Sequence, residues 1–346
     1  MKSSPIVVGV TTAIVAAVMF GVSAPLIGWA SRDTGVLATA CLLYAGAALI
    51  GGVARTRRAF TLQRADLPRL AAIAVCGAVI APALLVFGLH RSGALTASLL
   101  LNLEAVFTVV LAALIRREVI AGRVWVAVTL MAAGGAALAL DAAARGTGGV
   151  LGALAVVGAT LAWAIDNNLT QPLSSREPFD VVAAKASLGA TLTGAAAVVT
   201  GEAWPELSHL VALLACGATA YGLSLALYIL AQRRIGAART GSVFALAPFI
   251  GATVAWIAGE RAFGVWALAS LPLFALGVWL HLTEQHRDLH HHPVIGHVHA
   301  HRHDDGHHDH THDPPVDGEH AHSHEHHAVD HDHPHVHDDV HHGHSH

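Results

Sequence analysis

Ten apolar runs, each long enough to cross a lipid bilayer, constrain this chain more than any other feature. A helix needs about 20 residues to cross a hydrocarbon core of about 30 Å. The connections between the runs are too short to hold a soluble domain, so we predict an all-α integral membrane protein with ten transmembrane helices. The runs cover residues 6–30, 35–53, 70–89, 93–115, 124–140, 150–168, 180–200, 208–230, 237–259 and 265–282.

Charge and histidine divide the chain near residue 284. Charged residues make up 13% of the whole, against about 25% in average soluble domains. Residues 286–346 hold 25 of the 28 histidines and 12 of the 24 acidic residues, but only two basic ones. With neutral histidine this tail is strongly negative, whereas the remainder is positive. This composition excludes an ordinary soluble enzyme, a nucleic-acid-binding protein and a disulfide scaffold.

Lysine and arginine in the short connections predict the orientation in the membrane. With a cytoplasmic N-terminus, 14 basic residues fall on the cytoplasmic side, and four fall outside: Arg32, Arg91, Arg145 and Arg261. We therefore expect a multi-pass protein of the inner (cell) membrane with both termini cytoplasmic.

An internal repeat sets the expected architecture. When the chain is laid on itself so that residues 91–94 (RSGA) overlie 234–237 (RIGA), Phe20-Gly21 overlies Trp163-Ala164. Each copy holds five helices, and an odd number inverts the second copy in the membrane. Inverted copies that rock against each other give alternating access to a site at their interface, which is typical of transporters. We expect a first repeat over 1–145, a second over 146–284 and a tail over 285–346.

Three segments carry a resemblance to a known family. They are 100–107 (LLNLEAVF) running to Arg117-Glu118, 245–249 (ALAPF) running to 259–261 (GER), and 163–170 (WAIDNNLT). With these segments the chain resembles the EamA-type members of the drug/metabolite transporter (DMT) superfamily over about residues 6–282, although Ala105 stands where that family usually has proline. The resemblance implies ten helices in two inverted halves that move small metabolites, without implying which metabolite.

Polar residues inside the runs are the candidates for a transport site. A carboxylate at the bilayer centre costs at least about 2.5 kcal/mol. We therefore predict that Glu104 faces a cavity as a substrate ligand or a proton-coupling acid; the alternative is a structural acid hydrogen-bonded to a neighbouring helix. The further candidates each have packing or the membrane interface as their alternative, and they are Asn102, Asp166, Asn168, Lys185, Trp163, Tyr221 and Arg239.

Asp166 and Lys185 lie at similar depth near the predicted cytoplasmic ends of their runs, with Lys185 about one turn in. This placement suggests an ion-paired gate; the alternative is a cluster at the helix ends that reaches solvent by snorkelling. Motifs for ATP binding or catalysis are absent, so we predict no enzyme and no required cofactor. Four prolines inside the runs are expected to kink helices, and they are Pro25, Pro82, Pro248 and Pro272.

The tail has the composition of a disordered, metal-binding segment. It has no apolar periodicity and cannot bury a core, while neutral imidazole suits Zn, Ni, Co and Cu. Its His-x-His alternation predicts binding of a divalent transition metal; the alternatives are a passive buffer, a pH-sensitive charged tail and a drifted low-complexity end. The predicted ligands are His290, His291, His292, His297, His299, His301, His303, His307, His308, His310, His322, His324, His326, His331, His333, His335, His337, His344 and His346.

Three functions stay open at this point. In the first, the helices move a small organic metabolite or a metal chelate, with the tail as an accessory. In the second they move a transition metal such as Ni, Co or Zn, and in the third the protein is a membrane metal sensor or buffer that transports nothing. The runs contain no His or Cys pair to bind a soft dication, which favours the first. We expect the lipid bilayer and the solute as partners and no nucleic acid, and the oligomeric state stays open, a homodimer included.

Overall fold

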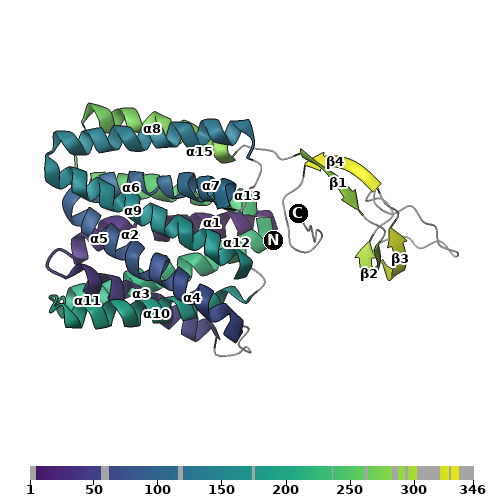
Figure 1. Ribbon diagram of the computed structural model, residues 1–346, viewed down its shortest axis with the longest axis horizontal. Helices are drawn as coiled ribbons and strands as arrows, with labels where there is room; N and C mark the ends of the chain where they lie inside the picture. The colour runs from purple at the N-terminus through teal and green to yellow at the C-terminus, as the bar shows by residue number, and fades with distance from the viewer. Residues whose placement is uncertain are drawn as a thin grey trace. The chain divides into compact units, whose positions relative to one another are not determined.

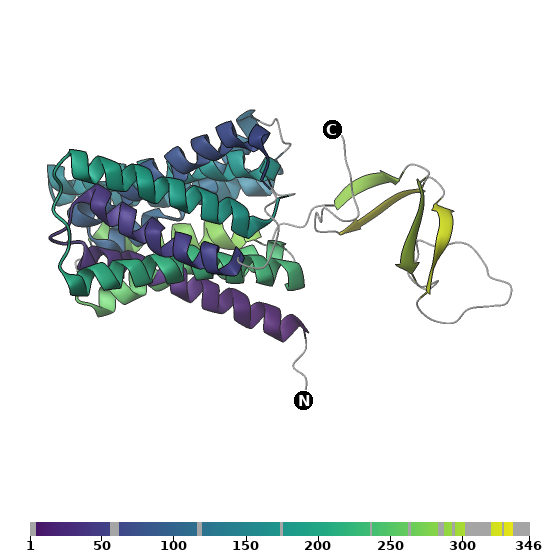
Figure 2. The same ribbon diagram turned by 90° about the horizontal axis from the view of Figure 1, so that it is seen from below.

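The structure, a computed structural model, divides into two units, Met1–Glu284 and Gln285–His346. The first unit is a bundle of helices that run alongside one another (Figures 1 and 2). The residues that the structure describes are 5–55, 62–115, 120–173, 176–235, 237–261, 264–282, 287–292, 295–301, 320–326 and 329–334.

Ten membrane spans form the bundle, as the apolar runs predict. Within the described residues, eight helical stretches are long and apolar enough to cross a membrane, and two shorter apolar helices accompany them. Four spans are single helices, namely α3 (Val36–Arg55), α8 (Gly122–Ala144), α10 (Pro178–Val199) and α15 (Val265–Leu282). The fifth apolar run, residues 124–140, is the shortest of the ten. The helix observed there, α8, is longer than the run at both ends.

The other six spans are built from consecutive helical segments. These are α1 (Pro5–Gly21) with α2 (Ser23–Ala30); η1 (Arg64–Asp66), α4 (Leu67–Ala74), the π-helical turn η2 (Val75–Ile80) and α5 (Ala81–Ser92); α6 (Ala94–Leu100) with α7 (Leu103–Ile115); α9 (Thr147–Thr170) with η3 (Gln171–Leu173); α11 (Leu207–Cys216), the π-helical turn η4 (Gly217–Leu223) and α12 (Ser224–Ile235); and α13 (Ala237–Phe244) with α14 (Ala247–Ile257).

The predicted repeat is present element by element. The repeat offset lays residue 91 on residue 234. With the same offset, α5 begins and ends at the positions equivalent to those of α12. Helices α6 and α8 likewise begin at the positions equivalent to the starts of α13 and α15. The π-helical turn η2 corresponds in the same way to η4. Because each copy holds five spans, the second copy is inverted relative to the first.

Prolines start helical segments at three of the four places where we expected kinks. Pro25 lies in the first turn of α2, and Pro82 and Pro248 lie within the first two residues of α5 and α14. A proline there removes an N–H that has no partner inside its own segment. Pro272 differs, because it lies inside the continuous helix α15.

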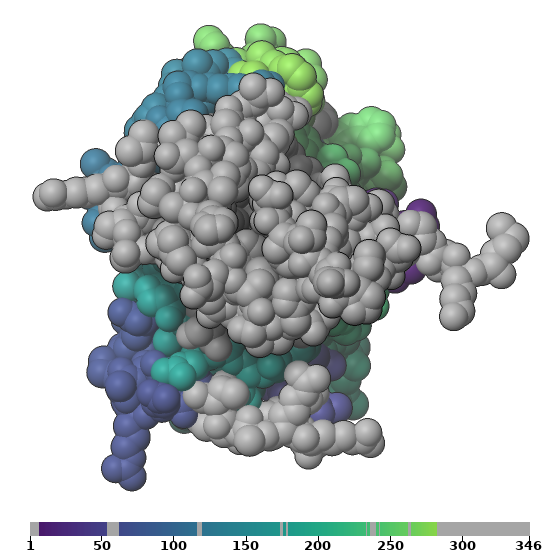
Figure 3. All heavy atoms as spheres, turned by 90° about the vertical axis from the view of Figure 1, so that its right-hand side faces the viewer, coloured from purple at the N-terminus to yellow at the C-terminus, as the bar shows by residue number. Residues whose placement is uncertain are grey.

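Small residues bring the spans close together. Helix α15 packs along α8 at one edge of the bundle (Figure 3), α10 packs along α3, α9 along α5, and α12 along α1. One close approach joins α3 to α11 and η4, where Gly46 and Gly217 lie. A Cβ atom on Gly46 would meet the carbonyl oxygen of Leu214 and lie 2.7 Å from the backbone nitrogen of Ala218.

The second unit contains strands in its described part. β1 (Arg287–His292) pairs with β4 (Val329–Pro334), and β2 (Ile295–His301) pairs with β3 (His320–His326), each as an antiparallel two-stranded sheet. The His-x-His pattern repeats every two residues, which is also the period of a strand.

Two glycines on the same helix should respond oppositely to alanine. Gly46→Ala places a methyl group against the backbone of α11 and η4, so α3 must move and the thermal unfolding midpoint in detergent should fall. Gly52→Ala is the matched control, because nothing lies within 4 Å of the position a Cβ would take. Alanine there should leave the midpoint unchanged or raise it, since glycine inside a helix costs up to about 1 kcal/mol. Equal midpoints for the two variants would contradict this packing.

Candidate functional site

Glu104 and Asn167 form the first part of a polar cluster inside the bundle. Glu104 lies in the first turn of α7, where its Oε1 atom accepts a hydrogen bond of 2.8 Å from the Nδ2 atom of Asn167 on α9. Glu104 is half-buried and Asn167 is exposed. The cluster thus holds a carboxylate of a membrane-spanning helix whose partner is an amide of a neighbouring helix, a contact that is compatible with both roles considered for Glu104.

The exposure of Asn167 is toward the inside of the bundle. At 100° per residue, Asn167 lies on the face of α9 opposite to Leu154 and Ile165. Leu154 is 57% exposed, as expected of a side chain that faces lipid. Asn167, which bonds Glu104 of α7, therefore lies on a face of α9 that is turned toward another helix.

An ion pair forms the second part of the cluster. The Nζ atom of Lys185 on α10 contacts the Oδ2 atom of Asp166 on α9, and the Asp166 side chain is 3% exposed. Lys185 lies about two turns into its helix, since α10 begins at Pro178, so it is deeper than the sequence suggested. Oδ1 of Asp166 also accepts a hydrogen bond of 3.3 Å from the Thr170 hydroxyl.

The π-helical turn η2 places the backbone of Gly77 beside this ion pair. The carbonyl oxygen of Gly77 accepts hydrogen bonds from the Tyr44 hydroxyl and, at 3.0 Å, from Nε1 of Trp163. A side chain at Gly77 would collide with the carboxylate of Asp166 and lie 2.8 Å from Nζ of Lys185. Glycine is therefore required where the ion pair meets the helix backbone.

The remaining predicted residues take other places. Asn102 is 5% exposed, and its amide donates to the carbonyl of Leu99 at 2.9 Å, within the break between α6 and α7. The amide of Asn168 donates to the carbonyls of Ala164 and Thr108. Tyr221 lies in η4, and its ring packs between those of Tyr44 and Phe20.

The other predicted positions have no described side chain. The backbone of Arg239 lies in α13, but its side chain is outside the described part. Among the predicted metal ligands, eleven backbone positions fall within the four strands, and the other eight lie outside the described residues, namely His303, His307, His308, His310, His335, His337, His344 and His346. In the described part of the chain, no group of three or more His, Cys, Asp or Glu side chains is arranged to hold a metal ion.

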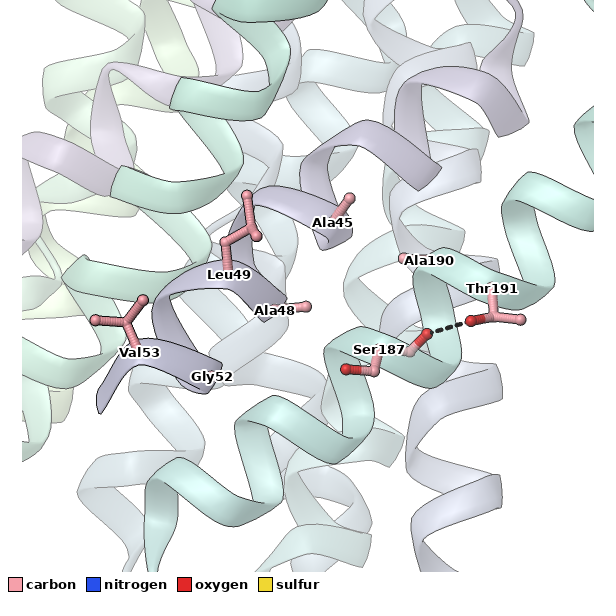
Figure 4. Close-up of a pocket in the computed structure, with 8 residues that line it drawn as sticks. All are labelled: Ala45, Ala48, Leu49, Gly52, Val53, Ser187, Ala190 and Thr191. Atoms are coloured by element: carbon pink, nitrogen blue, oxygen red, sulfur yellow. Dashed lines mark hydrogen bonds between the residues drawn. The ribbon is translucent and has the colours of Figure 1, made fainter. Parts of the chain in front are cut away.

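A groove lies on the outer surface of the bundle, between α3 and α10 (Figure 4). It has a volume of about 570 Å³ and is bordered by Leu49, Gly52, Ser187 and Thr191 among others. Leu49 is 63% exposed, and the Thr191 hydroxyl is already bonded to the carbonyl of Ser187. No titratable side chain borders this groove, so it fits lipid chains better than a polar solute.

Comparison with known proteins identifies the type of molecule. Residues 7–140 and 150–283 each match the EamA-like transporter family. The chain belongs to this family. It is thus a multi-pass membrane transporter of the DMT superfamily, built from two EamA repeats, and it is not an enzyme.

Individual relatives of this EamA transporter agree with that membership. A protein of Methanothermobacter thermautotrophicus (strain Delta H), described as an uncharacterized transporter, is 28% identical over 224 residues. The match covers 63% of this chain and 65% of the relative. One solved crystal structure of a protein, 17% identical in sequence, shares the fold with a TM-score of 0.57 over 81% of this chain and 96% of the other.

Sequence reasoning missed several residues of the cluster. It selected Asn168 where Asn167 contacts Glu104, and it overlooked Tyr44, Gly77 and Phe20. One signal was present, since all three tyrosines of the chain fall within apolar runs. The repeat offers another signal: Glu104 and Lys185 align with Ala247 and Leu42 in the other copy, so the charges are not needed for the shared fold.

Removing one partner of the Asp166–Lys185 pair should cost more stability than removing both. Asp166→Asn leaves a buried amine without a counter-charge, and Lys185→Met leaves a carboxylate. Loss of one partner of a buried pair costs about 3–5 kcal/mol, whereas an apolar replacement of both is often nearly neutral. We expect a loss of stability near the lower end of this range, because the Lys185 side chain is 20% exposed and keeps part of its contact with solvent. Thermal unfolding in detergent should place both single variants below the double variant Asp166→Leu/Lys185→Met; a double variant below both would contradict a net-neutral pair.

Proposed function

We propose that this EamA transporter moves a small organic metabolite or a metal chelate by alternating access, with Glu104 at the centre of the path. The observation that carries the proposal is an asymmetry between two copies of one fold. Inverted repeats reach the two open states of a transporter by exchanging their conformations, so copies that pack differently at the two faces are what such a mechanism requires.

The face opposite to the chain's N-terminus is closed by contacts between the repeats. The Oε2 atom of Glu202 accepts hydrogen bonds of 2.8 and 2.9 Å from the backbone nitrogens of Leu37 and Ala38, at the start of α3. The carboxylate of Glu260 accepts hydrogen bonds of 3.1 and 2.9 Å from those of Ala94 and Leu95, at the start of α6. In each case a glutamate of the second repeat caps a helix of the first, and carboxylates favour helix N-termini.

Helices α6 and α13 are equivalent by the repeat but are packed differently. Ser98 on α6 is 1% exposed, and its Oγ atom lies 2.7 Å from the position of a Cβ on Gly251 of α14. The equivalent residue on α13 is Gly241, where nothing lies within 4 Å of a Cβ. Among the described side chains, packing is therefore tighter at Ser98 than at its equivalent Gly241, which supports a conformation open toward the N-terminal face.

The remaining parts of the proposal concern orientation and coupling. The bias of basic residues supports cytoplasmic termini in an inner membrane, so the open face would be cytoplasmic. Glu104 then serves as a solute ligand that also takes up a proton. A transition metal is the less favoured cargo, because the described helices contain no set of three metal-ligating side chains.

Cysteine labelling at the symmetry-related positions 98 and 241 tests alternation. In a chain whose three native cysteines have been replaced, Gly241→Cys should react quickly with a maleimide in proteoliposomes, and Ser98→Cys should be protected. Adding Glu202→Gln and Glu260→Gln removes the caps that close the opposite face. Labelling at position 98 should then rise several-fold while labelling at 241 falls.

Opposite changes at the two positions are the decisive result. A rise at position 98 with no fall at 241 would mean that the opposite face frays locally without alternation. Equal labelling of the two positions in every background would overturn the proposed function.

We propose as a second function that the tail binds a divalent transition metal. The register of β2 and β3 supports this, because it sets His297 opposite His324, His299 opposite His322, and His301 opposite His320. The register thus sets three histidine positions of one strand, each two residues apart, against three of the other. Acidic residues in the tail add favourable charge for a dication.

Equilibrium dialysis against Zn²⁺ or Ni²⁺ tests the tail. The full chain should bind roughly six to eight ions at pH 7.5, at three or four ligands per ion. Binding should be lost near pH 5, because imidazole with an ordinary pKa of about 6.5 is then protonated and cannot coordinate. A chain that ends at Glu284 should bind almost none, and equal binding by the two chains would contradict the proposal.

A further inference from the structure

An ion pair at the N-terminal face has a counterpart of different chemistry at the opposite face. The Nε atom of Arg176, in the segment between η3 and α10, lies 3.1 Å from the Oδ2 atom of Asp66 in η1. The offset that lays residue 91 on residue 234 also lays Asp66 on His209 and Asp33 on Arg176. The counterpart of the ion pair is therefore an aspartate and a histidine, with the acidic and the basic position exchanged.

The elements that carry these residues correspond without a gap. The 3₁₀ turn η1 begins at Arg64 and α11 begins at the equivalent Leu207, while α2 ends at Ala30 and η3 at the equivalent Leu173. Helix α4, which follows η1, packs against α9 and α10, and its counterpart α11 packs against α2 and α3. The two sets of residues thus lie at the same junction of the fold, one at each face.

At the opposite face this pair is not formed in the present conformation. Among the described residues no ion pair joins Asp33 to His209. The ring of His209 instead meets that of Trp29 on α2 edge to face, with centroids 4.9 Å apart and an interplanar angle of 83°. Asp33 is exposed, and its carboxylate has no hydrogen bond or ion pair within the described part of the chain. The same junction is therefore paired at one face and separated at the other.

Other polar groups near this junction already have partners. The carboxylate of Glu202 caps the start of α3, and that of Glu206 accepts a hydrogen bond from a serine of α11. From α5, the Nε2 atom of His90 lies 2.7 Å from the Ser31 hydroxyl. The remaining charged or titratable groups on the packed elements are Arg32 and, farther along their helices, Cys41, Tyr44, Cys216 and Tyr221. Asp33 is thus the carboxylate at this junction that is left for His209.

Exchange of conformations between the repeats predicts where the separated residues go. Under the proposed function, each repeat adopts in the second state the conformation that the other has in the first. The start of α11 and the segment after α2 then take the geometry now seen at η1 and the segment after η3. In that geometry an aspartate carboxylate lies 3.1 Å from a cationic nitrogen. Asp33 and His209 therefore meet in the second state.

We propose that Asp33 and His209 form an ion pair when the protein is open at the face opposite to its N-terminus, so that acid at that face favours this state. The proton comes from the solution there and binds a ring nitrogen of His209. A histidine ordinarily changes its charge between pH 5 and 8, whereas an arginine stays charged throughout. The stabilisation by the Asp33–His209 pair is thus present at low pH and lost as the pH rises. This inference rests on the proposed function, to which it adds regulation by pH.

Changes of charge at positions 33 and 209 test the pair at constant pH. Maleimide labelling of Ser98→Cys and Gly241→Cys at pH 8 would report the two states, as above. Asp33→Arg/His209→Asp installs the ion pair of the N-terminal face, so labelling at position 98 should rise about 2- to 5-fold, as expected for an exposed pair, with no rise at 241. His209→Asp alone opposes two carboxylates and should give no rise at 98. Equal labelling of the double variant and His209→Asp would overturn the proposal.

A pH series tests the role of the histidine. Each labelling rate is divided by that of the same cysteine in the unfolded chain at the same pH. Between pH 8 and pH 5.5, labelling at position 98 should rise about 2- to 5-fold more in the parent than in Asp33→Asn or His209→Gln. Because the tail is intact in every variant, its own histidines do not alter this comparison.

Two control variants separate this pair from its neighbours. Glu206→Gln and His90→Gln remove the other carboxylate of the loop and the other histidine of this face, and both should respond to pH like the parent. Equal responses of the parent and Asp33→Asn would overturn the pair, and so would loss of the response in either control. A fall in labelling at acid pH would also overturn it, because a cation–π contact of the protonated ring with Trp29 would then dominate.

This test can fail independently of the proposed function. If removing the caps of Glu202 and Glu260 changes labelling at positions 98 and 241 in opposite directions but changes at 33 and 209 do not matter, the protein alternates without this switch. If no variant gives opposite changes, the proposed function itself is overturned.

Discussion

Backbone hydrogen bonding in a medium without water is the constraint on which this bundle depends. Each unpaired N–H or C=O in hydrocarbon costs several kcal/mol, so a helix can break within the membrane only where other groups take over. At η2 the carbonyl of Gly77 accepts hydrogen bonds from the side chains of Tyr44 and Trp163. Between α6 and α7 the side-chain amide of Asn102 donates a hydrogen bond to the carbonyl of Leu99. Spans that are broken into segments therefore require polar side chains at the bundle centre.

The same breaks give the bundle its site. Once a polar side chain is needed beside a carbonyl in the membrane interior, charged groups nearby gain partners that hydrocarbon does not offer. Asp166 and Lys185 meet against Gly77, where the absence of a side chain leaves room for both. The break therefore has a second consequence, which is a cluster of polar side chains in the membrane interior.

Much of the fold could be predicted from the sequence, but less of the site. Apolar runs and the internal repeat determine ten spans and two inverted copies, because a bilayer allows few alternatives. The choice between Asn167 and Asn168 depends on how α9 is rotated, since neighbouring residues on a helix point about 100° apart. No local pattern gives that rotation, and none indicates that Gly77 meets an ion pair from two other spans.

Charge balance connects the proposed site to the closure of the two faces. Asp166 and Lys185 neutralise each other, so the described centre carries the charge of Glu104 alone. Closing the N-terminal face over an empty, ionised site would strip water from that carboxylate, at a cost of several kcal/mol. A bound proton removes the charge and hence the cost. Under the proposed function, closure is therefore easy for the protonated protein and hard for the empty, ionised one, so a single carboxylate is enough to link closure to a proton.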